Sequence, residues 1–384
     1  MLIRPFILAA SISLGVITMA ACEDTASPRA VPPAPAASVS LDWQHEAGGL
    51  VAASRMSPLA AGRVYAAVGV AQYRAARAAG VNEQIDGAAY DARMGAVAGA
   101  SVQVLSFLFP AAADTLERKL AARIAAMSGN AQTEFTRGVA LGRQAGTESV
   151  ERLKVDGFTK PWTGTVQSGP GIWTPVTMPP AGILLGSVTP YFLTAGSQFR
   201  PAAPAFGSAA FNTDLNEVVQ FTKNRTPEQL ALARSWDYAA GTTTPVGYWN
   251  KTAAQYIAEK GLDELAATRV FGLMHATVFD ALIACWDAKY HYWMIRPYQA
   301  STDVALALAA PNHPAFPSGH SCVSASAARV LAEYFPEHGD QLARLVEDAG
   351  MSRIYAGIHY RFDVVAGQKL GVQVAEWAIN KNGL

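Results

Sequence analysis

The chain has 384 residues, of which 51% are hydrophobic and only 16% are charged, with 30 basic and 30 acidic side chains. So much apolar side chain excludes a mostly disordered protein, because it can bury a sizeable core. The balanced charge argues against a nucleic-acid-binding protein, which would carry a basic excess. Three cysteines are too few for a disulfide framework. A membrane protein is not excluded at this point, because many membrane proteins are poor in charged residues.

The beginning of the chain has the pattern of an export signal. Arg4 precedes an apolar run from Pro5 to Met19, and small residues then lead to Cys22. The sequence Met-Ala-Ala-Cys that ends there resembles a bacterial lipobox, with methionine where leucine is usual. We therefore expect residues 1–22 to be a signal peptide and Cys22 to be the lipidated N-terminus of an exported, periplasmic or cell-envelope lipoprotein. Ordinary secretion and an uncleaved anchor are the alternatives.

A second segment separates this signal from the folded part. Residues 23–40 are rich in proline, alanine and serine and are predicted to be a disordered tether, ahead of a folded domain at 41–384. The uncharged stretch from Met94 to Ala113 is long enough to span a membrane. Its polar and small residues favour a buried helix instead. We expect the N-terminal lipid to be the chain's one membrane contact.

The rest of the chain shows helical patterns separated by proline, glycine and serine, with no sustained strand alternation. A proline-rich segment at 157–207 is too long for a simple connector, and we expect it to lie across the helices. The sequence therefore predicts an all-α fold. The expected helices are residues 57–79, 90–109, 111–127, 132–155, 208–222, 226–239, 248–260, 263–292, 318–334, 337–348 and 359–380.

Cationic residues that suit an oxyanion gather in the last hundred residues. Lys289 and Arg296 are seven residues apart, two helical turns, so we expect them on one helix face before Pro297 stops that helix. The sequence Pro-Ser-Gly-His at 317–320 opens another helix, whose N-terminus is a ready anion site. Arg353 adds a second guanidinium, which can bond two oxygens of a tetrahedral anion at once. Together these groups predict a phosphate-like ligand.

Two histidines supply reactive groups. His359 and Asp363 are four residues apart on a predicted helix, so the carboxylate can accept from one ring nitrogen and leave the other as a nucleophile or ligand. His320, at the start of its helix, can be a general acid or base. Each feature alone has a plain structural explanation, such as a solvated cation pair or a core histidine. Their joint order and spacing argues against that explanation.

These segments resemble the signature of the type 2 phosphatidic acid phosphatase superfamily, which includes the vanadium-dependent haloperoxidases. The resemblance implies a helical bundle with an anion pocket near its end and an active-site core at residues 263–380. Weaker likeness to bacterial haloperoxidases extends upstream. It lies at Tyr191–Leu193, Phe199–Pro201, Trp249–Asn250 and Asp280–Trp293.

The resemblance also implies roles for single residues. His359 would be the vanadium ligand of a haloperoxidase or the phosphorylated nucleophile of a phosphatase, and Asp363 would orient it. His320 would be the acid and base in either enzyme, and Lys289 would also polarise bound peroxide. The residues that would hold the oxygens of vanadate or phosphate are Lys289, Arg296, Ser318, Gly319 and Arg353.

Two further residues favour the haloperoxidase branch. Trp286 resembles the tryptophan beside the lysine in haloperoxidases, although a plain core tryptophan is an alternative. His313 resembles the second active-site histidine of bromide- and iodide-oxidising members, and a polar loop residue is its alternative. We therefore expect a vanadate-dependent enzyme that oxidises bromide or iodide, rather than chloride, with hydrogen peroxide.

Other functions remain to be weighed against this one. The first alternative is an acid phosphatase that uses a histidine nucleophile on phosphomonoesters and needs no vanadate. A non-catalytic oxyanion-binding protein is a third hypothesis, against which the intact histidines argue. No nucleic-acid partner is expected, and a homodimer stays open. Cys285 and Cys322 are expected to be buried thiols, with a disulfide between them left open.

Overall fold

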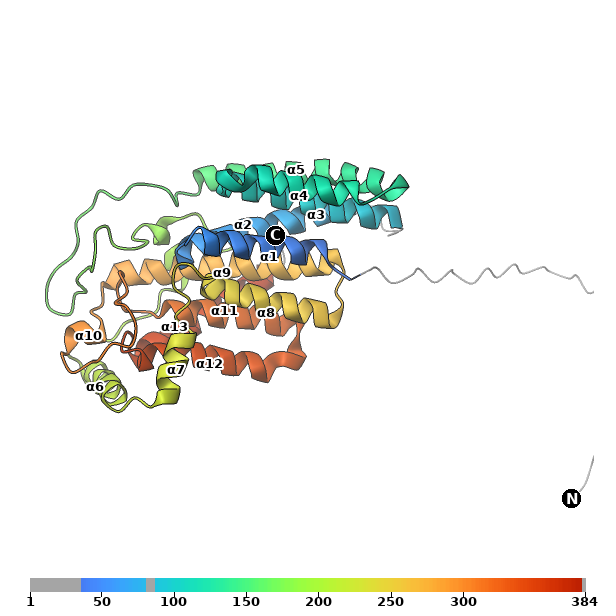
Figure 1. Ribbon diagram of the computed structural model, residues 1–384. Coiled ribbons are helices and arrows are strands. Elements are labelled where there is room, and N and C mark those ends of the chain that lie inside the picture. Colours follow the sequence, from blue (N-terminus) through green and yellow to red (C-terminus); the bar gives the residue numbers. More distant parts are fainter. Residues whose placement is uncertain (1–35, 81–86, 382–384) are drawn as a thin grey trace, which may run out of the picture. The chain divides into compact units, whose positions relative to one another are not determined.

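The computed structural model describes residues 36–80 and 87–381, and its helices are arranged as shown in Figure 1. Within these residues the structure is helical, and β contacts are limited to two isolated bridges, which confirms the predicted all-α fold. The thirteen α-helices of the described residues are α1 (Val39–Ala53), α2 (Pro58–Ala78), α3 (Gly87–Leu108), α4 (Ala113–Ala125), α5 (Gly129–Val155), α6 (Ala209–Lys223), α7 (Pro227–Ser235), α8 (Thr244–Lys260), α9 (Glu264–Tyr292), α10 (Pro297–Ala300), α11 (Gly319–Tyr334), α12 (Gly339–Tyr355) and α13 (Arg361–Lys381). The short 3-10 helices are η1 (Pro110–Ala112), η2 (Leu185–Ser187), η3 (Gly196–Phe199) and η4 (Pro336–His338).

The start of the folded part differs from the prediction. The predicted signal peptide, Cys22 and most of the predicted tether lie outside the described residues. However, the last residues assigned to the tether are ordered, because α1 already begins at Val39. The backbone N–H groups of residues 38–40 donate to the carboxylate of Glu264 at distances between 2.6 and 3.4 Å. The sequence could not show this start, since the acceptor is more than two hundred residues away.

Among the other differences from the prediction, the C-terminal ends of α7 and α12 are shifted the most. α7 stops at Ser235 rather than at residue 239, and Tyr238 has a φ of 41°, which no helix continues through. α12 runs to Tyr355 rather than stopping at residue 348. It passes through Gly350, although glycine is a poor helix former. A Cβ at this position would lie 2.6 Å from the side chain of Val364, so glycine lets α12 pack closely against α13.

α3 and α5 pack so closely that glycine is required between them. A Cβ on Gly138 of α5 would lie 1.9 Å from the carbonyl oxygen of Ala92 on α3. A Cβ on Gly95 of α3 would lie 2.0 Å from the carbonyl oxygen of Phe135 on α5. Any larger residue at these positions would have to push the two backbones apart. This pair of helices is the close-packed scaffold at one side of α2 in Figure 1.

α9 is the central helix and packs against α2, α11 and α13. By length and composition it is the one helix of the described part that could cross a membrane. However, 89% of its most apolar stretch is buried inside the fold, as expected for the core helix of a bundle. The uncharged stretch at 94–113 likewise forms buried residues of α3, as predicted, and ends in η1.

Polar groups on α9 hold the irregular segment at 157–207. The carboxylate of Asp280 accepts hydrogen bonds from the backbone N–H groups of residues 191–193 at 2.7 to 3.0 Å. Burial nevertheless raises the pKa of Asp280 to about 6. Further along, Arg200 donates two hydrogen bonds to Asp287, of 2.7 and 3.0 Å. The segment thus lies along α9, in agreement with the prediction that it crosses the helices.

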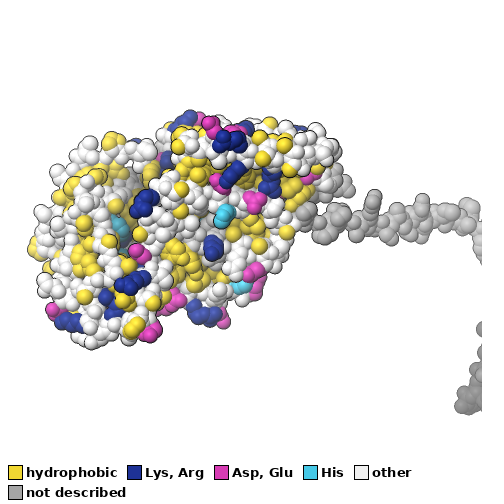
Figure 2. Space-filling view, in the orientation of Figure 1, with side chains coloured by type: hydrophobic (Ala, Val, Ile, Leu, Met, Phe, Trp, Pro, Cys, Tyr) yellow, Lys and Arg dark blue, Asp and Glu magenta, His cyan; other side chains and the backbone are white. Residues whose placement is uncertain are grey.

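The surface mixes both signs of charge. Figure 2 shows basic and acidic side chains interspersed with apolar ones over the visible face of the described residues. On this face, as in the chain as a whole, both signs of charge are present. The interior, by contrast, holds the buried cations Lys289, Arg296 and Arg353.

Candidate active site

A cavity of about 470 Å³ opens where the ends of α9, α11 and α12 meet the loops around them. Ten pocket residues were predicted from the sequence, and the structure brings them together in and behind its wall. Those that line the cavity are Trp286, His313, Gly319, His320, Arg353 and His359. Those that are fully buried behind the wall are Lys289, Arg296, Ser318 and Asp363.

Lys289 projects from the last turn of α9 into a ring of carbonyl oxygens. Its ammonium donates to the carbonyls of Pro314 and Ala315 at 2.9 and 2.8 Å, and also to that of Pro317. An ammonium has three hydrogens, so all of them are used. Burial lowers the pKa of Lys289 to about 8. The side chain therefore fixes the loop ahead of α11 and places a buried positive charge behind the cavity.

Arg296 reaches the site from a different element than predicted. α9 ends at Tyr292, and Trp293 caps it with a left-handed φ of 49°. Arg296 instead precedes Pro297 at the start of α10, where a residue before proline is kept out of the helical region. The prediction that Lys289 and Arg296 share one helix face is therefore wrong. The loop between the two helices brings the two cations together.

The Arg296 guanidinium bridges the two loops that carry active-site histidines. It donates to the carbonyl oxygens of His313 and Ile358 at 2.9 and 2.6 Å. It also lies 3.1 Å from Nδ1 of His313 and 3.5 Å from Nε2 of His359. Since a guanidinium only donates, His313 accepts through Nδ1. Burial lowers the pKa of Arg296 to about 10, which leaves it charged at neutral pH.

α11 begins at the predicted Ser-Gly pair. Ser318 is the N-cap, and its hydroxyl accepts from the backbone N–H of Ser321 at 3.4 Å. The N–H groups of Gly319 and His320 start the helix and have no acceptor within it. A Cβ on Gly319 would lie 3.1 Å from the indole ring of Trp286. Glycine therefore keeps this anion-binding helix end open toward the cavity.

His320 is held by a contact that the sequence did not reveal. Its Nε2 donates to the carbonyl oxygen of Trp236 at 2.9 Å, which leaves Nδ1 to face a ligand. Burial, followed by the charge of Arg353, keeps the pKa of His320 well below 6.5. A neutral imidazole with one fixed N–H is ready to accept a proton at the other nitrogen.

Arg353, in the last turn of α12, is oriented by its neighbour Ser352 and by a carbonyl group of α7. Its Nε donates to the hydroxyl of Ser352 at 2.9 Å, and its Nη2 donates to the carbonyl of Ala233 at 2.7 Å. Two of its five N–H groups are thus engaged, which leaves donors for an oxyanion. Burial lowers the pKa of Arg353 to about 10, opposed by the nearby carboxylate of Asp237.

His359 and Asp363 are paired as expected, but not on one helix. His359 lies two residues ahead of α13, and Asp363 lies in its first turn. The carboxylate accepts from Nδ1 of His359 at 2.8 Å and from the backbone N–H of Tyr360 at 3.1 Å. An acidic side chain that bonds back to the residue ahead of its helix is a capping arrangement. The prediction of a shared helix is wrong, because the chain ends α12 and turns at Gly357.

This pairing fixes the protonation of the site. With Nδ1–H bonded to Asp363, Nε2 of His359 keeps its lone pair. Burial, then the charge of Arg296, holds the pKa of His359 well below 6.5. Burial raises the pKa of Asp363 to about 7, although Lys289 opposes the shift. His359 is therefore neutral and able to act as a nucleophile or as a ligand.

Trp286 and His313 form one contact in the cavity wall. Their ring centroids lie 4.9 Å apart, and the indole N–H of Trp286 donates to the carbonyl of Ala181 at 3.0 Å. Burial and the neighbouring cations keep the pKa of His313 well below 6.5. The geometry places both side chains at the cavity rather than in a remote core or an outer loop.

Sequence reasoning missed three contributors to this site. Two are the carbonyl oxygens of Ala233 and Trp236, which a sequence cannot point out because every residue has one. The third is Asn312, whose amide N–H groups bond to Thr177 and Pro179 while its oxygen accepts two N–H groups of residues 176–177. Asn312 could have been noticed in the sequence because it directly precedes His313, which was predicted as a site residue.

The two cysteines near the site are free and buried in the structure. The Sγ atom of Cys285 lies 3.7 Å from the carbonyl oxygen of Pro317, which also accepts from Lys289. Cys322 lies in α11. The expectation of buried thiols thus fits the structure, and the disulfide alternative is not realised in it.

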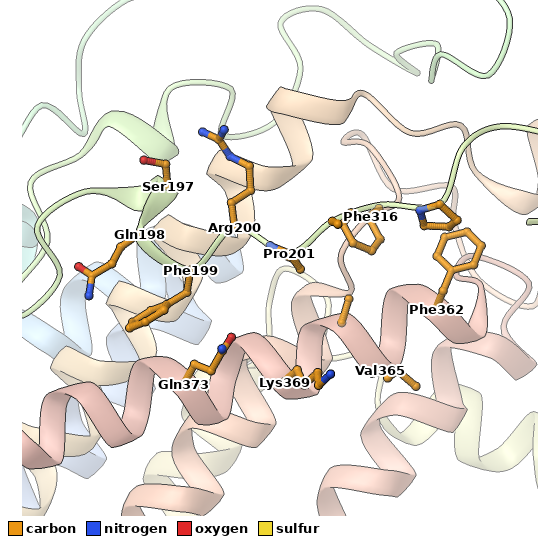
Figure 3. Close-up of a pocket in the computed structure, with 13 residues that line it drawn as sticks. Ser197, Gln198, Phe199, Arg200, Pro201, Phe316, Phe362, Val365, Lys369 and Gln373 are labelled. Carbon is orange, nitrogen blue, oxygen red and sulfur yellow. The ribbon is translucent and has the colours of Figure 1, made fainter. Parts of the chain in front are cut away.

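A separate cavity of about 660 Å³ lies between the segment around Phe199 and α13, and Figure 3 shows its lining. None of its thirteen described lining residues is histidine, cysteine, aspartate or glutamate. Of its two cationic side chains, Arg200 already pairs with Asp287, and Lys369 stands alone. The smaller cavity with three histidines is therefore the candidate active site.

Comparison with known proteins gives two kinds of relative. In sequence, the non-specific acid phosphatase of Providencia stuartii is 28% identical over 177 residues, which are 44% of this chain and 67% of that protein. The corresponding enzyme of Salmonella typhimurium is 33% identical over 89 residues, or 22% of this chain and 36% of its own length. The second alignment therefore spans about a third of that relative.

The similar solved structures are bacterial vanadium-dependent peroxidases. An iodoperoxidase superposes with a TM-score of 0.74 at 24% identity, over 89% of this chain and 95% of that one. An apo-type chloroperoxidase gives 0.69 at 16% identity, over 84% and 92%. At identities this low, the similarity establishes the fold alone. The similarity covers most of the chain and so extends far beyond the active-site segments.

Residues 266–382, which run from α9 to the end of α13, match the PAP2 superfamily. This range contains all ten pocket residues predicted from the sequence. The part of the chain that contains the candidate active site thus matches the PAP2 superfamily, and the fold of the chain is that of the bacterial vanadium haloperoxidases.

Proposed function

We propose that this chain is a vanadate-dependent haloperoxidase that oxidises bromide or iodide with hydrogen peroxide. The observation that carries the proposal is the packing of His313 against Trp286 in the wall that also contains His320 and His359. Phosphoryl transfer needs one nucleophilic histidine and one acid, so a third histidine bonded to Arg296 has no task in it. The similarity in fold to a bacterial iodoperoxidase, over most of both chains, agrees with the proposal.

The residues present fit vanadate. His359 offers an unprotonated Nε2 whose ring is oriented by Asp363, as metal-bound histidines usually are. The donors for the oxygens are the start of α11 and Arg353, with two more buried cations behind them. The described residues contain no cluster of three or more side chains that could hold a bare metal ion, so a single histidine with surrounding donors suits an oxyanion. When bound, vanadate supplies a Lewis acid that activates peroxide toward halide without changing its own oxidation state.

The chain's own residues then have separable tasks. Asp363 keeps the proton of His359 on Nδ1, and the Trp236 carbonyl keeps that of His320 on Nε2. His320 can therefore take the proton of incoming peroxide at Nδ1 and return it to a leaving oxygen. Lys289 contributes its charge from behind the wall. A direct bond from Lys289 to a ligand oxygen requires that it release one of its three carbonyl partners.

A phosphatase is the second candidate, and the acid phosphatase of Providencia stuartii supports it through sequence similarity. In this function Nε2 of His359 attacks the phosphorus of a phosphomonoester, and the ester bond to the alcohol breaks. His320, after it takes up a proton at Nδ1, gives that proton to the leaving alcohol, and Arg353 with the start of α11 stabilises the phosphoryl oxygens. Water then breaks the bond between His359 and phosphorus and releases phosphate. No vanadate is then needed.

One set of assays separates the two. The purified protein is assayed with vanadate, hydrogen peroxide and each halide, and separately with a phosphomonoester in the absence of vanadate. We expect halide oxidation that depends on vanadate and falls at least about a thousandfold in His359→Ala. The matched control is His291→Ala, which removes an exposed histidine outside the cavity. Phosphate release without any halide oxidation would establish the second candidate instead.

We also propose that the chain is exported and lipidated at Cys22. This rests on the sequence alone, since residues 1–35 lie outside the described part. Expression with labelled palmitate should label the wild-type protein and leave Cys22→Ala unlabelled. Label in both proteins, or in neither, would remove the lipoprotein assignment.

A further inference from the structure

The proton position of His320 depends on one backbone carbonyl just after α7. Trp236 directly follows Ser235, the last residue of α7, and its carbonyl oxygen lies 2.9 Å from Nε2 of His320. The same peptide group is held on its other side, because the N–H of Asp237 donates to the carbonyl of Arg234 at 3.1 Å. In a trans peptide the N–H and the carbonyl point in opposite directions, so whatever fixes this peptide also fixes the acceptor of His320.

Beyond this peptide the backbone makes a turn that needs support from side chains. Tyr238 has a φ of 41°, in the left-handed region that a bulky residue rarely adopts. The centroid of its ring lies 6.2 Å from that of Trp236 and 5.6 Å from that of Tyr248. The rings of Trp236 and Tyr248 are closer still, at 4.8 Å. All three distances are typical of favourable aromatic pairs, so this cluster holds the turn after α7.

Tyr248 connects this cluster to the helix that carries His320. It lies in α8 beside Trp249, whose indole N–H donates to the hydroxyl of Ser324 at 3.1 Å. Ser324 follows His320 by four residues on α11, so both lie on one face of that helix. The rings of Tyr248 and Trp249 are themselves 5.6 Å apart. Through these contacts α8 joins the turn after α7 to the first part of α11.

We propose that Tyr248 is a positioning residue, whose ring holds Trp236 so that the Trp236 carbonyl keeps the proton of His320 on Nε2 and leaves Nδ1 to take up another. Tyr248 is half-buried and does not line the candidate active-site cavity, so it acts through Trp236 and not on a ligand. The inference rests on the acid and base role of His320 in the proposed function. That role is the same in a haloperoxidase and in a phosphatase, so either activity can report on it.

The direct test observes the ring N–H proton of His320 by NMR in the purified protein without vanadate. A buried N–H that donates to a carbonyl exchanges slowly with water, so we expect its resonance in the wild type and its absence in His320→Ala, which assigns it. In Tyr248→Ala we expect exchange to be at least about tenfold faster. Tyr248→Phe keeps the ring and should keep the slow exchange.

The matched control is Tyr256→Ala, in the same helix. Tyr256 is 1% exposed, packs on the rings of Phe335 and His338 and lies outside the cavity. Because Tyr256 is more buried than Tyr248, its loss should lower the urea midpoint at least as much, yet leave the His320 proton in slow exchange. Should Tyr248→Ala not fold, Tyr248→Leu keeps an apolar side chain without the flat ring, and it should also exchange faster than Tyr248→Phe.

The rate is a second measurement. We expect kcat of Tyr248→Ala to fall about tenfold, because His320 is no longer oriented, with KM within about threefold. In Tyr248→Phe and in Tyr256→Ala, kcat per folded molecule should stay within about twofold of the wild type. A purely structural role of Tyr248 would change the urea midpoint and leave kcat per folded molecule as it is.

Three results would overturn the inference. The first is a wild type without a slowly exchanging His320 proton, or one whose proton exchanges as slowly in Tyr248→Ala. The second is equally fast exchange in Tyr248→Ala and Tyr256→Ala, which would indicate general loosening of α8. The third is fast exchange in Tyr248→Phe, which would assign the effect to the hydroxyl. Absence of both activities in the wild type removes the proposed function instead, and the exchange rates still decide whether Tyr248 positions His320.

Discussion

The α3 and α5 pair and the active-site end of α9, α11 and α12 are both built from packed helices, yet they are held together in opposite ways. In the first region, glycines such as Gly95 and Gly138 let one helix backbone touch the other. In the second region the helices end, and loop carbonyls turn toward buried cations such as Lys289 and Arg296. Contact between helices thus depends on backbone packing in one place and on buried charge in the other.

This difference separates stability from chemistry. The contacts between α3 and α5 are steric, and no predicted catalytic residue takes part in them. The contacts at the active-site end fix protonation states, such as those of His320 and His359. Substitutions in the first region should therefore change the free energy of unfolding, whereas those in the second should mainly change rates.

The largest effect is expected for Gly138→Ala. The new Cβ would lie 1.9 Å from the backbone oxygen of Ala92, so the two helices must separate. We expect the free energy of unfolding to fall by more than about 4 kcal/mol, measured by urea denaturation. The rate per folded molecule should stay unchanged.

The control for this variant is Gly49→Ala in α1, where a Cβ would meet nothing within 4 Å. Alanine should stabilise that helix by up to about 1 kcal/mol. Equal effects of the two substitutions would show that close backbone packing does not hold α3 to α5.

The next largest effect is expected for Asp363→Asn. Without the negative charge, the tautomer of His359 is no longer enforced, and we expect kcat to fall about ten- to a hundredfold. The matched control is Asp280→Asn, a second buried carboxylate, which binds backbone N–H groups rather than a histidine. That control should lower stability and leave the rate per folded molecule within about twofold. A similar loss of rate in both variants would contradict the assigned role of Asp363.

The sequence was informative wherever a side chain itself carries the chemistry. The buried cations, the Ser-Gly helix start at 318–319 and the pairing of His359 with Asp363 follow from residue types and spacing, whereas Trp286 and His313 were predicted from the resemblance to haloperoxidases. The periodic helices were also predictable, and α2 is an example, since the predicted helix at 57–79 agrees with the observed Pro58–Ala78.

The sequence failed where position depends on distant backbone. Arg296 was placed on α9 because its spacing from Lys289 equals two turns, but the left-handed Trp293 ends the helix before it. The first turn of α1 depends on Glu264, and the orientation of His320 on the Trp236 carbonyl. Neither acceptor has a local signature, because one is remote and the other is common to every residue.

A smaller effect is expected for Asn312→Ala. Asn312 ties residues 176–179 to the loop that carries His313, through both its amide N–H groups and its oxygen. Loss of these bonds should loosen the wall formed by the neighbouring Ala181, so we expect KM to rise about tenfold with kcat within about threefold. The control is Asn224→Ala, an exposed asparagine at the end of α6. A fall in kcat with KM unchanged would instead place Asn312 in the chemistry.

The smallest effect on the rate is expected from a change to acid pH. This change tests whether the buried histidines at the active-site end stay neutral. Burial and Arg353 hold the pKa of His320 well below 6.5, so the neutral form that accepts a proton persists into the acid range. An ordinary histidine would lose about nine-tenths of its neutral form at pH 5.5. In Asp363→Asn, which removes the carboxyl whose pKa is about 7, we therefore expect the remaining kcat/KM to fall less than about twofold between pH 7 and 5.5. The free energy of unfolding, unlike the rate, should respond to acid pH. Because the unfolded chain binds the proton more readily, the free energy of unfolding should decrease as pH falls below 6.5. A rate profile with its acid midpoint near 6.5 would show that His320 is solvated rather than buried beside a cation.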